Sequence, residues 1–185
     1  MTIDSVKCLN SVMWTRSLPC LTELDIEYDN NVEKLEEVGE VLKMSCCLSS
    51  LRILRINSCI KLTSIGKGVL QHLTALQKLT VSNCYNLALS CDEGAEVEED
   101  IAVDDPSFLP LPQTLRSLKL HNLPKVVHLP EWMQHLTSLQ SLHIEYCKGL
   151  KSLPEWMTHL TSLTKLKISS CAENLCVDLE SKYVS

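Results

Sequence analysis

The chain has 185 residues, of which 45% are hydrophobic, and its 17 Lys and Arg face 23 Asp and Glu for a net charge of −6. This length suffices for one domain with a sizeable core, and the absence of an 18-residue apolar run excludes a membrane span. Eight acids and no base lie in 91–106, so the remaining residues are slightly basic, at +2 (−6 minus −8). Only one Phe is present, so we expect Leu to form the core.

A pattern of the form Leu-x-x-Leu-x-Ile-x-x-Cys-x-x-Leu recurs along the chain. Its six copies begin at Leu21, Leu51, Leu76, Leu115, Leu139 and Leu163. The spacings between these residues are 30, 25, 39, 24 and 24, which gives a base period of 24 or 25. A period of roughly 20–29 residues with this leucine pattern is the signature of the leucine-rich repeat.

Each copy predicts one short strand, because Leu-x-Ile alternates with the period of two that buries one face of a strand. Strands from successive repeats pair in parallel, and no repeat buries its apolar face alone. We therefore predict a single α/β domain over 1–185, a leucine-rich-repeat solenoid (horseshoe) of about six repeats. The parallel β-sheet would form the concave face, and short helices or turns the convex face.

The return legs between strands show helical spacing. In "LPEWMQHL" (129–136), apolar residues recur at i, i+3, i+4 and i+7, which predicts a short helix or helical turn. This stripe consists of Leu129, Trp132, Met133 and Leu136. Pro130 and Pro154 suit a first-turn position, where a missing N–H costs nothing. The segment 32–44 has similar spacing and predicts a longer return helix in repeat 1.

Two segments depart from the repeat. The acidic insertion 90–106 is too polar to order itself by burial, so we expect it to be disordered. A sharper hypothesis is that it folds across the basic concave face and competes with a partner. The C-terminal tail, 172–185, is polar enough for a partial cap.

Two 20-residue stretches, 128–147 and 152–171, share 13 identical residues. Five of the seven differences fall at x positions of the strand pattern, which we expect on the open concave face. A contact surface would vary in this way over a constant framework. Drift at solvent-exposed positions would look the same.

The x positions of repeats 2–6 form a predicted basic face. Its seven basic residues are Arg52, Arg55, Lys78, Arg116, Lys119, Lys165 and Lys167. Glu145 opposes them, and His143 and Tyr146 complete the candidate protein-binding set, whereas repeat 1 presents Glu23, Asp25 and Glu27. The face is either simply solvated, a nucleic-acid surface or a binding face for an acidic protein partner. The negative overall charge and few aromatic residues disfavour nucleic acid, and we favour the protein partner.

Enzyme and metal motifs are missing. No P-loop, G-x-G-x-x-G, H-E-x-x-H, G-x-S-x-G or C-x-x-C pattern occurs, so we expect no catalysis, cofactor or metal. One His per return leg suggests a polar edge contact at His72, His135 and His159. Four of the ten Cys occupy one repeat position, where small apolar filling explains them. We expect reduced, buried thiols and an intracellular protein.

The stretch 129–171, with "LPEWMQHLTSL" and "LHIEYCKGLKSLP", resembles the C-terminal leucine-rich repeats of plant nucleotide-binding disease-resistance receptors of the cereal coiled-coil class. The resemblance implies a cytoplasmic domain for innate immunity and disease resistance. Such a domain senses a pathogen effector directly or through a guarded host protein, and it contacts the receptor's nucleotide-binding domain to hold it inactive. The family's ATPase motifs are missing, and the short array and acidic insertion depart from the family. The alternative is an adaptor or inhibitor scaffold, such as a substrate-recognition arm of a ubiquitin ligase.

Overall fold

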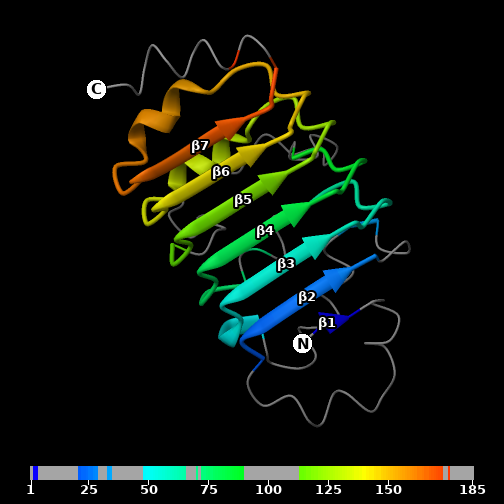
Figure 1. Cartoon of the computed structure of the whole chain (residues 1–185). Helices are drawn as coiled ribbons and strands as arrows, with labels where there is room; N and C mark the ends of the chain where they lie inside the picture. Colours follow the sequence, from blue (N-terminus) through cyan, green and yellow to red (C-terminus); the bar gives the residue numbers. More distant parts are fainter. Residues whose placement is uncertain are drawn as a thin grey trace, which may run out of the picture.

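A single parallel sheet organises the chain (Figure 1). The computed structural model describes residues 2–3, 21–28, 33–34, 48–65, 70, 72–89, 113–172 and 175. Within these ranges seven strands lie side by side in the order in which they occur along the chain. They are β1 (Thr2–Ile3), β2 (Glu23–Glu27), β3 (Ile53–Asn57), β4 (Lys78–Ser82), β5 (Ser117–His121), β6 (Ser141–Glu145) and β7 (Lys165–Ser169). Strands β2 to β7 are the six predicted repeat strands, so the leucine-rich-repeat fold is confirmed.

The leucine pattern sets which side of each strand is buried. In β3, Leu54 and Ile56 are buried, while Ile53, Arg55 and Asn57 alternate with them on the more exposed face. The same alternation holds in β2, β4 and β5. Register keeps equivalent positions side by side, so Leu54 pairs with Leu79 and Ile56 with Val81. Rows of equivalent apolar side chains therefore stack from repeat to repeat, as solenoid packing requires.

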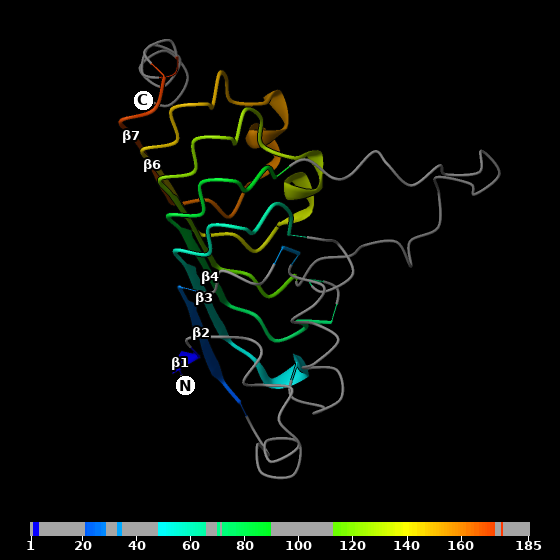
Figure 2. The same ribbon diagram turned by 90° about the vertical axis from the view of Figure 1, so that its right-hand side faces the viewer.

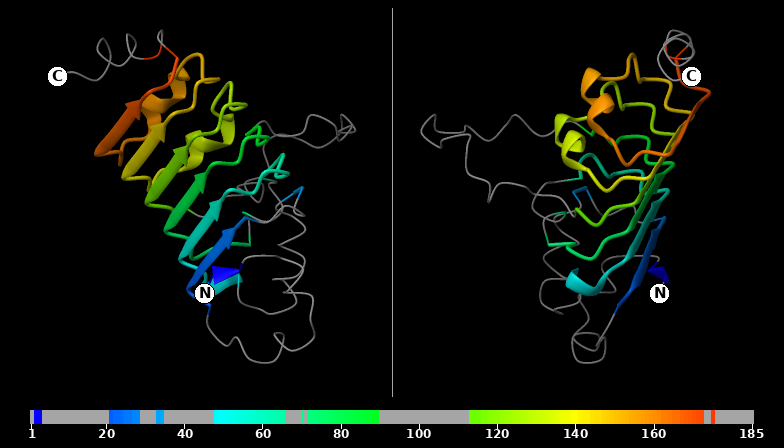
Figure 3. Two further views of the ribbon diagram at one scale, coloured as in Figure 1. Left: turned by 45° about the vertical axis from the view of Figure 1, so that its right-hand side comes forward. Right: turned by 90° about the vertical axis from the view of Figure 1, so that its left-hand side faces the viewer.

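The return legs lie behind the sheet, as the views turned by 90° show (Figures 2 and 3). They contain the 3-10 helices η2 (Leu48–Ser50), η4 (Glu131–His135) and η5 (Glu155–His159). In η4 the side chain of Met133 is fully buried, and Trp132 packs half-buried against the core. The predicted apolar stripe therefore faces the sheet. Pro130 lies one residue earlier than predicted, at the cap, where its carbonyl accepts the Met133 N–H at 3.1 Å.

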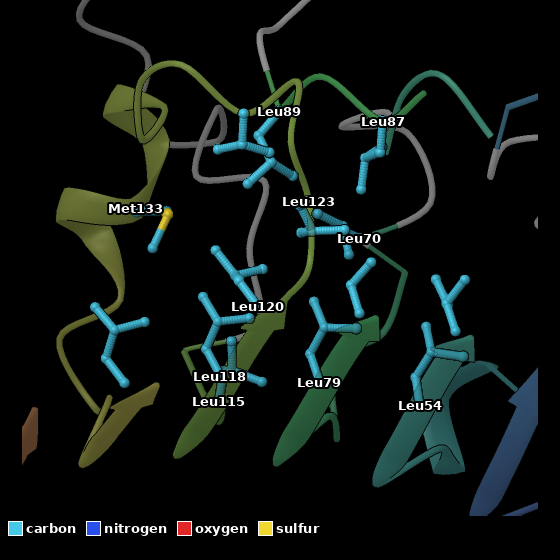
Figure 4. Packing of buried hydrophobic residues seen from close by; sticks show 14 of the residues in the cluster. Leu54, Leu70, Leu79, Leu87, Leu89, Leu115, Leu118, Leu120, Leu123 and Met133 are labelled. Carbon is cyan, nitrogen blue, oxygen red and sulfur yellow. The ribbon is translucent and has the colours of Figure 1, made fainter. Parts of the chain in front are cut away.

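The core between sheet and return legs is built mainly from Leu (Figure 4). Leu118 and Leu120 point into it from β5, and Leu123 reaches it from the segment that follows β5. At the repeat position predicted for filling, the buried thiols are Cys59, Cys84 and Cys147. This composition confirms that Leu, and not aromatic residues, forms the core.

Several predictions fall outside the described residues. They concern most of the helix expected over 32–44, all of the acidic insertion 90–106, and most of the tail 172–185. Of the first segment only 33–34 are described, and Lys34 forms an isolated parallel bridge with Ser64. Of the tail, Ala172 and Leu175 are described, and Leu175 is fully buried. In the part of the chain that the structure describes, no helix is long and apolar enough to cross a bilayer.

Candidate protein-binding surface

The exposed face of the sheet carries a row of side chains from the third position of each five-residue strand. The register places them in the order Asp25, Arg55, Thr80, Lys119, His143 and Lys167. Neighbouring strands lie about 4.8 Å apart, so side chains adjacent in this row are within reach of one another. The repeat pattern predicts this row, whereas the role of its members in binding stays a prediction.

Arg55 joins the acidic first strand to the basic remainder of the face. Its Nη1 atom lies 2.8 Å from Asp25 Oδ1 and 3.4 Å from Glu23 Oε2. The hydrogen bond donated to Asp25, helped by the charges of both carboxylates, raises the pKa of the Arg55 guanidinium despite its partial burial. The acidic patch of repeat 1 is thus partly neutralised within the sheet.

Glu145 is held between two lysines from neighbouring strands. Its carboxylate pairs with Lys167 from β7 and, at 3.5 Å, with Lys119 Nζ from β5. Although Glu145 is only 8% exposed, the hydrogen bond from Lys167 and the charges of both lysines hold the pKa of its carboxyl below the usual value. The cluster carries a net charge of one positive unit, so Glu145 masks one of these two basic groups.

The other four basic residues of the predicted set keep their charge exposed. Arg52, Lys78, Arg116 and Lys165 are exposed, and none forms an ion pair with another residue that the structure describes. Lys78 and Lys165 begin β4 and β7, whereas Arg52 and Arg116 directly precede β3 and β5. These four residues lie at the N-terminal ends of the strands, and we call them the basic edge.

His143 and Tyr146 lie on and beside β6. His143 Nε2 lies 3.2 Å from Ser141 Oγ on the same strand, and its imidazole lies between Lys119 and Lys167 in the register. Tyr146 directly follows β6 and is 49% exposed. Its ring meets the ring of His121 edge-on, with centroids 5.2 Å apart. Both side chains therefore form part of the solvent-facing surface of the sheet.

Sequence reasoning missed an amide network beyond the C-terminal ends of the strands. Asn122 Nδ2 donates to Asn83 Oδ1 at 2.9 Å, and Asn83 Nδ2 donates to Asn57 Oδ1 at 3.0 Å. Asn83 and Asn122 also adopt positive φ angles, a conformation that Asn tolerates better than most residues. The signal was visible as an Asn in "INSC", "SNC" and "HNL", at or after the strand end.

The repeat cysteines are placed for packing and not for nucleophilic chemistry. Burial raises the pKa of Cys147 to about 11. A hydrogen bond with Cys59, together with burial, raises the pKa of Cys84. A thiol with a raised pKa carries little thiolate at neutral pH and is therefore a poor nucleophile. Among the residues described, no group of three or more His, Cys, Asp or Glu could hold a metal ion.

The comparison with protein families agrees with the repeat pattern. The family model described as "Plant disease resistance protein RPS2-like, leucine-rich repeats" matches residues 21–172. No curated protein sequence matches the chain significantly. A crystal structure of an internalin (inlF) from Listeria monocytogenes has 17% sequence identity and a TM-score of 0.29. That match covers 89% of this chain, which spans 60% of the internalin chain.

The family match extends from the first residue of the first repeat to one residue beyond the cysteine of the sixth. It therefore includes all six repeats and every candidate residue of the exposed face. The chain belongs to the RPS2-like leucine-rich repeats of plant disease resistance proteins.

Proposed function

We propose that this domain is the protein-recognition part of an intracellular plant immune receptor of the cereal coiled-coil class. It binds a pathogen effector directly or through a guarded host protein, and it also contacts the receptor's nucleotide-binding domain to limit activation. Family membership supports this proposal, because leucine-rich repeats of disease resistance proteins are generally protein-binding and typically non-catalytic. The motif "LPEWMxHLTSL", which occurs in the return legs of repeats 4 and 5, supports the receptor class.

The observation that carries the proposal is the basic edge on a rigid sheet. Its four side chains come from four different repeats, yet the parallel register fixes their relative positions. Lys78 and Lys165 lie in one row three strands apart, or about 14 Å. Exposed charges without intramolecular partners attract an acidic protein surface and mainly set its specificity and association rate.

A matched pair of charge reversals tests the proposal. The variant Lys78→Glu/Lys165→Glu changes two exposed lysines of the basic edge without breaking an ion pair among the described residues. We expect it to lose at least one protein captured by the wild type from plant extract, supplied with and without pathogen proteins. The proteins retained on wild type and variant are compared by mass spectrometry at the same low salt concentration.

The control variant is Lys34→Glu/Lys151→Glu, which changes the net charge equally at exposed sites outside the strands. It should retain the same proteins as the wild type. Circular dichroism must show that all three forms fold. If both variants lose the same proteins equally, the effect reflects net charge, and the basic edge is not the recognition site.

A further inference from the structure

Exposed apolar side chains lie in the loops that follow the strands. Four large hydrophobic residues are exposed among those described: Tyr28, Ile60, Tyr85 and Tyr146. Tyr28 and Tyr146 directly follow β2 and β6, and Ile60 and Tyr85 lie three residues after β3 and β4. All four therefore lie beyond the arrowheads in Figure 1, at the edge opposite the basic edge.

Neighbouring loops at this edge are joined by hydrogen bonds. Asn86 Nδ2 donates to the Ile60 carbonyl at 2.7 Å, which joins the loops after β4 and β3. Asn122 Nδ2, after β5, reaches Asn83 Oδ1 at 2.9 Å and lies 3.5 Å from Tyr85 Oη.

The loops after β5 and β6 approach even more closely. A Cβ atom on Gly149 would lie 2.2 Å from the Pro124 carbonyl oxygen, so only glycine permits this packing. The strip from Ile60 to Gly149 is thus continuous and preorganised. Binding of a partner would therefore cost little conformational entropy for ordering these loops.

The same strip is basic. Lys61, Lys125 and Lys148 are exposed, and none forms an ion pair with a residue in the described ranges. Of the described acids, Glu145 is buried and already paired with Lys119 and Lys167, whereas the exposed Glu33 lies near Lys61, because its carbonyl accepts the Thr63 N–H at 2.8 Å. Apolar and cationic side chains therefore alternate along the strip, and no described acid forms an ion pair with its three lysines.

Tyr146 occupies a position where the backbone conformation does not favour an aromatic residue. Its φ angle is 57°, in the left-handed region, and the residues directly after the other repeat strands share this conformation: Tyr28, Ser58, Asn83, Asn122 and Ser170. Asn suits this region better than Tyr does, so the backbone conformation does not account for an aromatic residue here. An exposed aromatic ring at this position has no role in the core, so its place fits a surface contact.

We propose that this strip, formed by Ile60, Lys61, Tyr85, Lys125, Tyr146 and Lys148, docks an acidic segment of the protein partner. Apolar side chains of the segment pack on Ile60, Tyr85 and Tyr146, and its carboxylates face the lysines. Tyrosine anchors of this kind dominate the energetics of protein interfaces. The proposal rests on the protein-binding function proposed above and adds a second surface, opposite the basic edge, to it.

Two synthetic polymers serve as probes: a random copolymer of glutamate and tyrosine, and polyglutamate without an aromatic group. Affinities for these polymers and for an oligouridylate are measured at low salt by fluorescence anisotropy with wild type, the three variants given next and Lys78→Glu/Lys165→Glu. The first variant, Tyr85→Ala/Tyr146→Asn, removes two anchors and places at position 146 the residue that its backbone prefers. The second is Lys125→Glu/Lys148→Glu, and the control is Lys34→Glu/Lys151→Glu.

We expect wild type to bind the copolymer more tightly than polyglutamate. The tyrosine variant should weaken copolymer binding about tenfold and leave polyglutamate binding unchanged. The Lys125→Glu/Lys148→Glu variant should weaken both probes, and the control should weaken neither by more than about twofold.

Several results would overturn the proposal. If Lys78→Glu/Lys165→Glu abolished copolymer binding while both strip variants bound normally, the strip would be excluded and the basic edge would stand. Equal binding of the two polymers by wild type would exclude apolar anchoring. Tighter binding of an oligouridylate than of the copolymer would replace the protein segment by a single-stranded nucleic acid.

Discussion

The stretches 128–147 and 152–171 share 13 of 20 residues but differ in burial. Leu142, Ile144 and Cys147 of the first are completely buried, whereas the equivalent residues of the second are only half-buried. These equivalents are Leu166, Ile168 and Cys171. The strand of the first stretch, β6, lies between β5 and β7, and β7 pairs with β6 alone among the strands described. The same framework residues are fully buried only where a repeat stacks on each side.

The difference between the two strands assigns stability to the interface between repeats and not to the repeat itself. An isolated copy of the pattern has an apolar face with nothing to cover it. Substitutions at equivalent positions of β6 and β7 should therefore have unequal effects, although the residues replaced are identical.

Truncation of a core side chain should have the largest effect on stability. Leu142→Ala should lower the free energy of unfolding by about 2–5 kcal/mol, as truncation of a fully buried Leu does. Leu166→Ala should cost less than about 2 kcal/mol, because part of its surface already contacts water. Urea denaturation of both variants measures the difference.

His143→Ala, on the exposed face of β6, is the control for this pair and should change stability by less than about 0.5 kcal/mol. Equal losses for Leu142→Ala and Leu166→Ala would show that neighbour stacking does not determine stability here.

A second substitution sharpens the comparison between neighbouring loops. Gly149→Ala should destabilise by about 1–3 kcal/mol, the usual cost of overpacking, because its Cβ would meet the Pro124 carbonyl. Lys125→Ala, at the equivalent position after β5, should be nearly neutral because that side chain is exposed. Thermal unfolding followed by circular dichroism distinguishes them, and a neutral Gly149→Ala would show that the two loops are not closely packed.

The ion pairs of β6 predict a pH dependence. The pKa of Glu145 is lowered in the folded protein, so its contribution is present above the unfolded value of about 4.3 and is lost as pH falls through the folded value. Because both partner lysines are exposed, the contribution should be below about 1 kcal/mol. Unfolding free energies of wild type and Glu145→Gln, measured from about pH 7 to pH 3, should converge at low pH. A constant difference would contradict the assigned ion pairs.

The smallest effect concerns the residue after β7. Ser170 has a φ of 55°, and Asn occupies the equivalent position in repeats 3 and 4. Ser170→Asn should stabilise the domain by up to about 1 kcal/mol, because Asn adopts this conformation at lower cost. Denaturant titration would detect it, and Ser170→Val, which should destabilise, is the opposing control.

Strands β2 to β7, their order and their register could be predicted because Leu-x-x-Leu-x-Ile repeats with a nearly constant period, whereas the two-residue β1 lies outside that pattern. The buried stripe of η4 followed from the spacing of Leu129, Trp132, Met133 and Leu136 in the same way. The pairing of charges could not be predicted, because whether Lys119 and Lys167 share Glu145 depends on the reach of side chains across three strands.

The contacts between the loops could not be predicted from the sequence either. The repeat pattern assigns no specific role to Gly149, and its closeness to Pro124 arises only when two repeats stack. Likewise, Asn122 is an ordinary x position until register brings it beside Asn83.

The central claim is that this domain binds a protein through the exposed face of the sheet and the loops that follow its strands. Hydrogen exchange measured by mass spectrometry, with and without a partner captured by the wild type, tests it most directly. We predict slower exchange on binding in peptides that cover β3 to β7 and the loops after β3 to β6, with no change in η4 and η5. Protection confined to η4 and η5 would contradict the claim and move recognition to the return legs.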